Sequence, residues 1–181
     1  MSIFLSGGCK NGKSFLAQRL AKQLSEAQGV PLYYVATMAP HDAEDDARIA
    51  RHRAERAGWG FETAEQPRDL CAVLRRCRPD GVFLLDSLTA LVANEMFPAE
   101  GFDWNAGTRV AGDLRRFLRA APNAVIVSDF IYSGAELFGD LTKPYLAALA
   151  LCDRTAASLC GCVLEIAAGT VTCHKGEPPC V

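Results

Sequence analysis

The sequence lacks the marks of a secreted or membrane-spanning protein. No amino-terminal export signal is recognisable, and no run of about 18 apolar residues occurs, because Asp153, Arg154 and Glu165 interrupt the hydrophobic carboxyl-terminal third. The net charge is only −2, so the basic face of a nucleic-acid-binding protein is missing too. We therefore expect a cytoplasmic protein with no membrane span and no nucleic-acid partner.

Paired metal-ligand spacings are missing as well, although the chain contains eight cysteines. Cys160 and Cys162 form a single C-x-C, and no C-x-x-C pair is matched by a second one. Because no export signal is present, we interpret the cysteines as reduced thiols, with the buried ones acting as small hydrophobic residues. The alternative is a zinc site at Cys160, Cys162, Cys173 and His174, which requires a suitable pairing of the last strands.

Internal repeats and low-complexity segments are absent, and strand-like and helical patterns alternate along the chain. With 181 residues, of which 50% are hydrophobic, residues 1–181 are most simply one domain with one core. The alternation predicts an α/β fold with a mostly parallel central sheet, helices on both faces and ligands at the carboxyl ends of the strands. Strands are expected at residues 2–6, 32–36, 81–85, 124–127, 163–167 and 170–173, and helices at residues 14–28, 42–56, 67–77, 88–96, 105–119 and 142–159.

The most informative motif is Gly-Gly-Cys-Lys-Asn-Gly-Lys-Ser at residues 7–14, which fits the Walker A pattern G-x-x-x-x-G-K-[S/T] between a strand and a helix. Its glycines let successive N–H groups turn toward a phosphate, and the positive end of the next helix faces the same anion. Lys13 is expected to reach the β- and γ-phosphates, and the Ser14 hydroxyl to ligate Mg²⁺. The sequence therefore predicts a P-loop NTPase fold that binds a nucleoside triphosphate.

A second signal is Asp86, a carboxylate that directly follows the apolar strand pattern at residues 81–85. This is the Walker B arrangement, in which an acidic side chain holds Mg²⁺ directly or through water. The alternative role is to cap the helix that follows, and the two roles are compatible.

A third signal lies in residues 42–56, where acidic residues crowd the first turn and arginines the later turns. This order suits the helix dipole and would stabilise a solvated helix whatever its function. However, Arg48, His52 and Arg56 recur every four residues and so share one face. The guanidinium groups disfavour the imidazolium, which keeps His52 neutral and nucleophilic, and they offer donors to phosphate oxygens. The functional alternative is therefore a histidine that takes up a phosphate-linked group.

Further motifs follow the phosphate loop in a fixed order. They are Tyr-Tyr-Val-Ala-Thr-Met at residues 33–38, Arg-Ile and His-Arg within residues 48–56, Phe-Glu-Thr-Ala-Glu at 61–65, Leu-Leu-Asp-Ser-Leu at 84–88 and Leu-Val-Ala-Asn-Glu-Met-Phe at 91–97. In this order, over nearly the whole chain, they resemble the bifunctional adenosylcobinamide kinase/adenosylcobinamide-phosphate guanylyltransferase family. The helix that carries Arg-Ile and His is not an ordinary feature of small kinases.

The resemblance implies two reactions of cobalamin biosynthesis. A nucleoside triphosphate, ATP or GTP, phosphorylates adenosylcobinamide; GTP then guanylylates a histidine, and GMP passes to adenosylcobinamide phosphate to give adenosylcobinamide-GDP. The resemblance further implies a corrinoid partner, Mg²⁺ held by Ser14 and Asp86, a homotrimer, and catalytic roles for His52 and Lys13. The implied nucleotide-binding residues are Gly7, Gly8, Cys9, Lys10, Asn11, Gly12, Lys13, Ser14, Ala36, Thr37, Met38, Arg53, Ala54, Glu55, Arg56, Glu65 and Asp86.

The chain departs from the family pattern at several positions. Arg51 stands where some members carry the first of two adjacent histidines, and Asp86 replaces the usual glutamate. Residues 128–134 replace an Asn-Glu-Val-Gly-like loop, and Asp153-Arg154 replace an Asn-Gln pair. Two alternatives stay open: a kinase-only P-loop enzyme for a small alcohol, and a regulatory GTPase-type module. The second is disfavoured because the chain has no Asn-Lys-x-Asp guanine motif.

Overall fold

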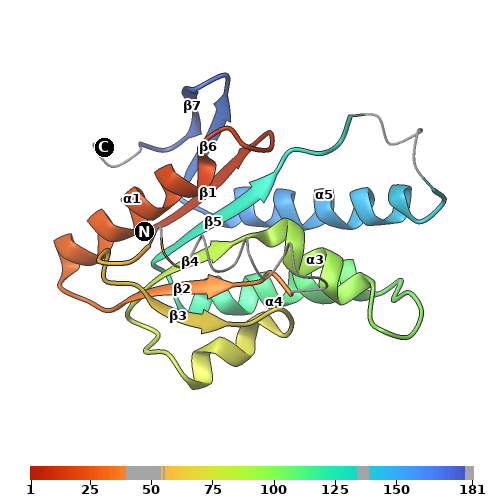
Figure 1. Ribbon diagram of the computed structural model, residues 1–181, viewed down its shortest axis with the longest axis horizontal. Helices are drawn as coiled ribbons and strands as arrows, with labels where there is room; N and C mark the ends of the chain where they lie inside the picture. The colour runs from red at the N-terminus through yellow and green to blue at the C-terminus, as the bar shows by residue number, and fades with distance from the viewer. Residues whose placement is uncertain (40–53, 55, 134–138, 178–181) are drawn as a thin grey trace.

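The computed structural model describes residues 1–39, 54, 56–133 and 139–177, and these form one sheet with helices on both faces (Figure 1). The strands lie in the order β3-β2-β4-β5-β1-β6-β7, and every neighbouring pair is parallel except β6 and β7. Their bounds are Ser2–Gly7 for β1, Leu32–Ala36 for β2, Glu62–Glu65 for β3, Val82–Asp86 for β4, Ala124–Asp129 for β5, Cys162–Ala167 for β6 and Thr170–Lys175 for β7.

The helices divide unequally between the two faces of the sheet. Helix α1 (Lys13–Gln28) packs on one face, and α3 (Leu88–Met96), α4 (Ala106–Ala120) and α5 (Thr142–Leu159) pack on the other (Figure 1). A short 3₁₀ helix, η1 (Leu70–Arg75), packs against α4 on this second face. Both faces of the central strands are therefore covered, as a parallel sheet requires.

The alternation of side chains in the strands explains why the apolar runs are continuous. In β1, Ile3 and Leu5 belong to the core under α1, while Phe4 between them belongs to the core under the other helices. In β4, Leu84 points to the α1 side and Phe83 and Leu85 to the opposite side. Because successive side chains of a strand point to opposite faces, a strand buried on both faces needs apolar residues throughout.

The predicted α/β fold with a mostly parallel sheet is confirmed, but one expected helix needs correction and one strand is additional. The helix expected at residues 67–77 is wrong in type and extent, because only the 3₁₀ helix Leu70–Arg75 forms there after Asp69, whose φ is 48°. Strand β3 was not expected, because its Glu-Thr-Ala-Glu sequence buries only Ala64 and it lies at the sheet edge. The helix expected at 42–56 lies outside the described residues except for Ala54 and Arg56.

Neither a membrane-spanning helix nor a cluster of metal ligands occurs within the part of the chain that the structure describes. None of its helices combines the length and the apolar character needed to cross a bilayer. Around the possible zinc ligands, Cys160 and Cys162 are buried, whereas Cys173 and His174 are exposed. His174 Nε2 instead lies 2.8 Å from Glu165 Oε2. No group of three or more His, Cys, Asp or Glu side chains among the described residues is placed to hold a metal ion.

Candidate active site

The phosphate loop connects the end of β1 to the start of α1, so the first turn of α1 faces the loop. Gly7 has a φ of 155°, and a Cβ there would lie 2.3 Å from the carbonyl oxygen of Ile166 on β6. Gly12, which precedes α1, has a φ of 89°. The Asn11 side chain donates to the same Ile166 carbonyl at 2.7 Å. These contacts tie the loop to β6 and make glycine necessary at position 7.

Lys13 is buried in this loop and has internal partners for all its donors. Its side chain is 5% exposed, and Nζ donates to the Gly8 carbonyl at 2.6 Å and to Asn11 Oδ1 at 3.4 Å. The third acceptor is Asp129 Oδ1, at 2.9 Å. An ammonium group has three N–H donors, so these three acceptors saturate it. A phosphate oxygen can reach Lys13 only by displacing at least one of them.

Asp129 is the acidic residue closest to the phosphate loop in the sheet register, and none of the sequence motifs singles it out as a site residue. It ends β5 and lies directly opposite Gly7 of β1. Its backbone N–H donates to Thr89 Oγ1 at 2.8 Å, and its side chain is 27% exposed. The missed signal is that a carboxylate follows the apolar run of β5 after one serine, much as Asp86 directly follows that of β4.

Asp86 ends β4, two strands away from the loop. It pairs with Val127 of β5, which in turn pairs with Leu5, two residues before Gly7. Tyr34 donates its hydroxyl to Asp86 Oδ2 at 2.9 Å. The alternative capping role falls to its neighbour, because the Ser87 side chain is the cap that accepts from the Ala90 N–H at 3.2 Å.

The segment that follows β2 is held against the start of α3. Thr37 is fully buried; its hydroxyl donates to the Ser87 carbonyl at 2.8 Å and accepts from the Ser87 N–H at 2.7 Å. Asn94 donates to the Thr37 carbonyl at 2.7 Å. These bonds fix the backbone between the half-buried residues Ala36 and Met38. That any of the three contacts nucleotide stays a prediction.

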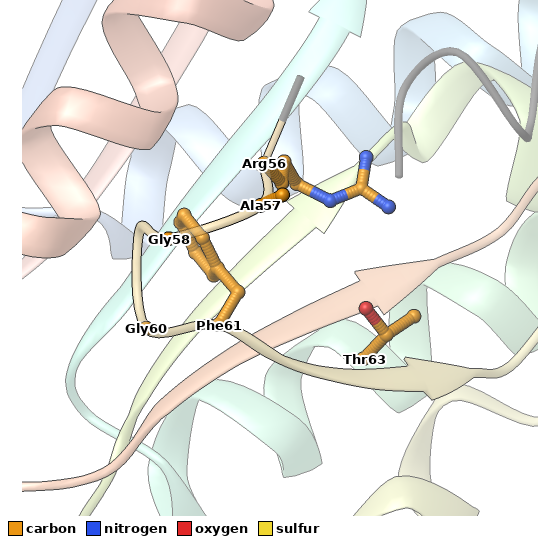
Figure 2. Close-up of a pocket in the computed structure, with 6 residues that line it drawn as sticks. All are labelled: Arg56, Ala57, Gly58, Gly60, Phe61 and Thr63. Atoms are coloured by element: carbon orange, nitrogen blue, oxygen red, sulfur yellow. The ribbon is translucent and has the colours of Figure 1, made fainter. Parts of the chain in front are cut away.

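Arg56 forms a second cationic site, on the α1 side of the sheet. Its guanidinium lies 3.5 Å from the centroid of the Tyr34 ring, and the residue is 7% exposed. Its Nε and Nη1 have no hydrogen-bond partner within the described residues. The side chain lines a cavity of about 440 Å³ together with Ala57, Gly58, Gly60, Phe61 and Thr63, and Figure 2 shows it extending from the turn that precedes β3. A buried cation with open donors fits an anion or a hydrogen-bond-accepting base edge.

Tyr34 links Asp86 to Arg56, because its hydroxyl donates to the Asp86 carboxylate and its ring packs against the Arg56 guanidinium. Glu65 ends β3 and is exposed, and Arg76 donates to its carbonyl at 3.2 Å. Ala54 is exposed as well. The remaining predicted site residues on this segment, His52, Arg53 and Glu55, lie outside the described residues.

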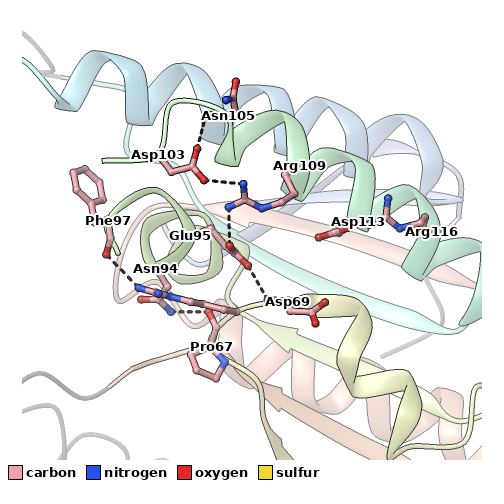
Figure 3. A network of polar contacts seen from close by, with 11 residues as sticks. Pro67, Asp69, Asn94, Glu95, Phe97, Asp103, Asn105, Arg109, Asp113 and Arg116 are labelled. Atoms are coloured by element: carbon pink, nitrogen blue, oxygen red, sulfur yellow. Dashed lines mark hydrogen bonds and ion pairs between the residues drawn. The ribbon is translucent and has the colours of Figure 1, made fainter. Parts of the chain in front are cut away.

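A separate polar network joins α3, α4 and η1, and it carries no predicted site residue (Figure 3). Arg109 donates to Glu95 Oε2 at 3.0 Å and to Asp103 Oδ2 at 2.7 Å. Glu95 Oε1 accepts the Asp69 N–H at 2.7 Å, and Asn94 donates to the Pro67 carbonyl at 3.0 Å. These contacts hold the segment before η1 and the segment before α4 against α3.

Comparison with known protein families matches residues 3–173 to the family described as cobinamide kinase / cobinamide phosphate guanyltransferase. The chain belongs to this family. It is also 34% identical over 181 residues to the bifunctional adenosylcobalamin biosynthesis protein CobP of Pseudomonas aeruginosa, with 98% of this chain and 99% of that protein covered. The predicted family is thus confirmed, and the chain is a bifunctional cobinamide kinase and guanylyltransferase of cobalamin biosynthesis.

Solved structures support the fold independently. The chain is similar to the ATPase domain of G40P, with a TM-score of 0.57 and 14% identity over 98% of this chain and 78% of that one. It is also similar to a KaiC-like protein from Pyrococcus horikoshii, with a TM-score of 0.53 and 12% identity over 97% of this chain and 79% of that one. At these identities the likeness concerns the fold alone, and it confirms the P-loop NTPase architecture.

Proposed function

We propose that this cobinamide kinase and guanylyltransferase uses two cationic sites, the phosphate loop for phosphoryl transfer and the Arg56 region for guanylyl transfer. The observation that carries this assignment is the buried Arg56 guanidinium, which has two open donors beside a cavity, while Lys13 lies in a separate loop with its own partners. One cation would serve a single phosphate site. Two separately built cations suit an enzyme with two nucleotide-dependent steps.

In the kinase step, the loop at residues 7–14 binds the triphosphate through its backbone N–H groups and the start of α1. Lys13 contacts the β- and γ-phosphates and stabilises the charge that develops during transfer. The acceptor is the terminal hydroxyl of the aminopropanol arm of adenosylcobinamide, and the products are adenosylcobinamide phosphate and a nucleoside diphosphate. Either ATP or GTP serves as the phosphoryl donor in this proposal.

In the guanylyl step, His52 is the nucleophile. A neutral imidazole nitrogen attacks the α-phosphorus of GTP, the bond to the bridging oxygen breaks, and pyrophosphate leaves. A phosphate oxygen of adenosylcobinamide phosphate then displaces the histidine to give adenosylcobinamide-GDP. Arg56, four residues after His52 in the sequence, donates hydrogen bonds to the guanine nucleotide through its guanidinium group. Further contacts to this nucleotide come from Ala36, Met38 and Glu65, at the ends of β2 and β3.

Mg²⁺ is the metal that we propose for both steps. Ser14 and Asp86 offer the oxygen ligands that this hard cation prefers, and both side chains are partly accessible. When bound, the ion supplies positive charge to the phosphate oxygens. The hydroxyl of Tyr34 orients the Asp86 carboxylate for this role.

Four further features rest on the sequence or on family membership rather than on this chain's contacts. We propose that residues 1–181 act as one nucleotide-binding domain, that three copies assemble into a homotrimer, and that the enzyme works in the cytoplasm on a corrinoid substrate. Sedimentation of the purified protein tests the trimer, because the mass in solution distinguishes three copies from one or two.

Labelling with GTP carrying radioactive α-phosphate tests the guanylyl step. We expect an acid-labile, base-stable GMP adduct on the peptide that contains His52. Arg56→Ala should reduce adduct formation about 10- to 100-fold at limiting GTP, because a charged hydrogen bond contributes roughly 1.5–3 kcal/mol. Arg56→Lys, which keeps the charge and loses the planar fork, should lie between Arg56→Ala and the wild type. An adduct on His41 or His174, or no adduct at all, would contradict the assignment.

A further inference from the structure

Lys13, the lysine of the phosphate loop, is already paired with an anion, the Asp129 carboxylate. Lys13 Nζ lies 2.9 Å from Asp129 Oδ1, and this is the lysine that a nucleoside triphosphate must engage. Lys13 also keeps two neutral acceptors from its own loop, the Gly8 carbonyl and the Asn11 side chain. Since a phosphate oxygen is a charged acceptor at the same place, the partner that it displaces is the other anion, Asp129.

Displacement leaves the Asp129 carboxylate beside a phosphate group without its cation. The backbone N–H of Asp129 is held by Thr89 Oγ1 at 2.8 Å, and β5 is paired with β1 up to Gly7, so the residue keeps its position at the loop. A carboxylate close to a second anion becomes a better proton acceptor, because like charges disfavour its ionised form. A hydroxyl group that enters between the Asp129 carboxylate and the phosphate would therefore have a proton acceptor within reach.

A neighbouring carboxylate, Asp153 on α5, is less suited to this role. Its Oδ2 already accepts the Tyr132 hydroxyl at 2.6 Å. Burial raises the pKa of Asp153, and the nearby charge of Asp129 raises it further. Asp153 Oδ1 is also buried, whereas the Asp129 side chain is 27% exposed beside Lys13. An incoming hydroxyl can therefore reach Asp129 more readily than Asp153.

We propose that Asp129 is the general base of the kinase step. This inference rests on the proposed phosphorylation of adenosylcobinamide. The hydroxyl oxygen forms a bond to the γ-phosphorus, and the bond from that phosphorus to the β–γ bridging oxygen breaks. The hydroxyl proton passes to the Asp129 carboxylate, and the nucleoside diphosphate leaves with the electron pair of the broken bond. The Lys13–Asp129 ion pair holds the base in place until the triphosphate releases it.

The role also explains why one carboxylate serves only one of the two reactions. The acceptor in the kinase step is an alcohol, which carries a proton that must be removed. The acceptor in the guanylyl step is a phosphate monoester, whose attacking oxygen is already ionised at neutral pH. Asp129 is therefore needed for phosphoryl transfer and dispensable for guanylyl transfer.

Asp129→Asn tests the proposal, because the amide keeps the size of the side chain and an acceptor for Lys13 but cannot take up a proton. We expect kcat for cobinamide phosphorylation to fall between about 10²- and 10⁴-fold, with KM for the nucleotide changed less than about threefold. Formation of adenosylcobinamide-GDP from supplied adenosylcobinamide phosphate should stay within about threefold of the wild type. Asp140→Asn, at an exposed carboxylate between β5 and α5, is the matched control and should leave both rates unchanged.

Three outcomes separate this inference from the function on which it rests. If the wild type makes no cobinamide phosphate, the proposed function itself is wrong. If the wild type makes it and Asp129→Asn retains kcat within tenfold, only the assignment of the base is overturned. An equal loss of both reactions in Asp129→Asn would also overturn it, because that result indicates a role in nucleotide or metal binding. Thermal unfolding of the variant near the wild-type temperature confirms that the measured loss is chemical.

Discussion

Lys13 and Arg109 are both cations with carboxylate partners, but their surroundings indicate different roles. Lys13 is 5% exposed and lies in a glycine-containing loop of the Walker A pattern, which binds phosphate through backbone N–H groups. Arg109 is 44% exposed and donates to both Glu95 and Asp103, which belong to segments on either side of it (Figure 3). In our proposal the first cation exchanges an internal partner for a substrate, whereas the second keeps its partners and fixes two loops. Burial and the chemistry of the surrounding loop, rather than the presence of an ion pair, distinguish a functional charge from a structural one.

The largest expected effect follows from removing the exchangeable cation. Lys13→Ala should abolish the phosphorylation of adenosylcobinamide while the protein stays folded, because Asp129 is partly exposed and can reach water. The loss of one positive contact to a transferring phosphoryl group costs on the order of 3–5 kcal/mol of transition-state stabilisation. Steady-state assays of adenosylcobinamide phosphate formation check this. Lys22→Ala, on the same helix, is the control; Lys13→Ala turnover within tenfold of the wild type would place Lys13 with the structural cations.

A smaller effect on activity is expected at Asp86. Like Arg109 it has a partner within the protein, the Tyr34 hydroxyl, and like Lys13 it has a proposed partner from outside the protein, Mg²⁺. Asp86→Asn should raise the Mg²⁺ concentration for half-maximal activity about tenfold, and nucleotide binding measured in EDTA should change less. Asp80→Asn, in the turn that precedes the same strand, provides the control. A Mg²⁺ dependence equal to that of the wild type would remove Asp86 from the metal site.

The smallest effect on activity is expected at Arg109, where only stability should change. Arg109→Ala leaves the mostly buried Glu95 carboxylate with the Asp69 N–H as its remaining partner in this network. We expect a loss of about 1–2 kcal/mol in the free energy of unfolding, since partly exposed ion pairs contribute little individually. Urea denaturation measures this loss, with Arg119→Ala on the same helix as the control. A loss of kinase activity without a loss of stability would break the comparison with Lys13.

Much of the fold follows from the sequence because its elements are locally determined. The Walker A motif requires a strand before it and a helix after it, and β1 and α1 form at the expected places. Strand β3 escapes prediction because a four-residue edge strand with one buried residue has no apolar pattern. Its identity as a strand comes from long-range pairing with β2, which no local signal encodes.

The candidate site is less predictable for the same physical reason. Lys13, Ser14 and Asp86 stand out because motif and strand pattern are local in sequence. The contact between Lys13 and Asp129 joins residues more than a hundred positions apart, and it depends on β5 lying next to β1. The stacking of Arg56 on Tyr34 likewise depends on how the turn before β3 folds over the sheet. Such contacts become visible only when strand order is known.

The most direct test of the two-step account is the mass of the corrinoid made by His52→Asn from adenosylcobinamide, GTP and Mg²⁺. The wild type should give adenosylcobinamide-GDP. The variant should stop at adenosylcobinamide phosphate, because phosphoryl transfer needs the loop and Lys13, whereas asparagine cannot form the guanylylated intermediate. His174→Asn, which changes a histidine paired with Glu165 on the β6–β7 hairpin, should behave as the wild type. Formation of adenosylcobinamide-GDP by His52→Asn would contradict the account.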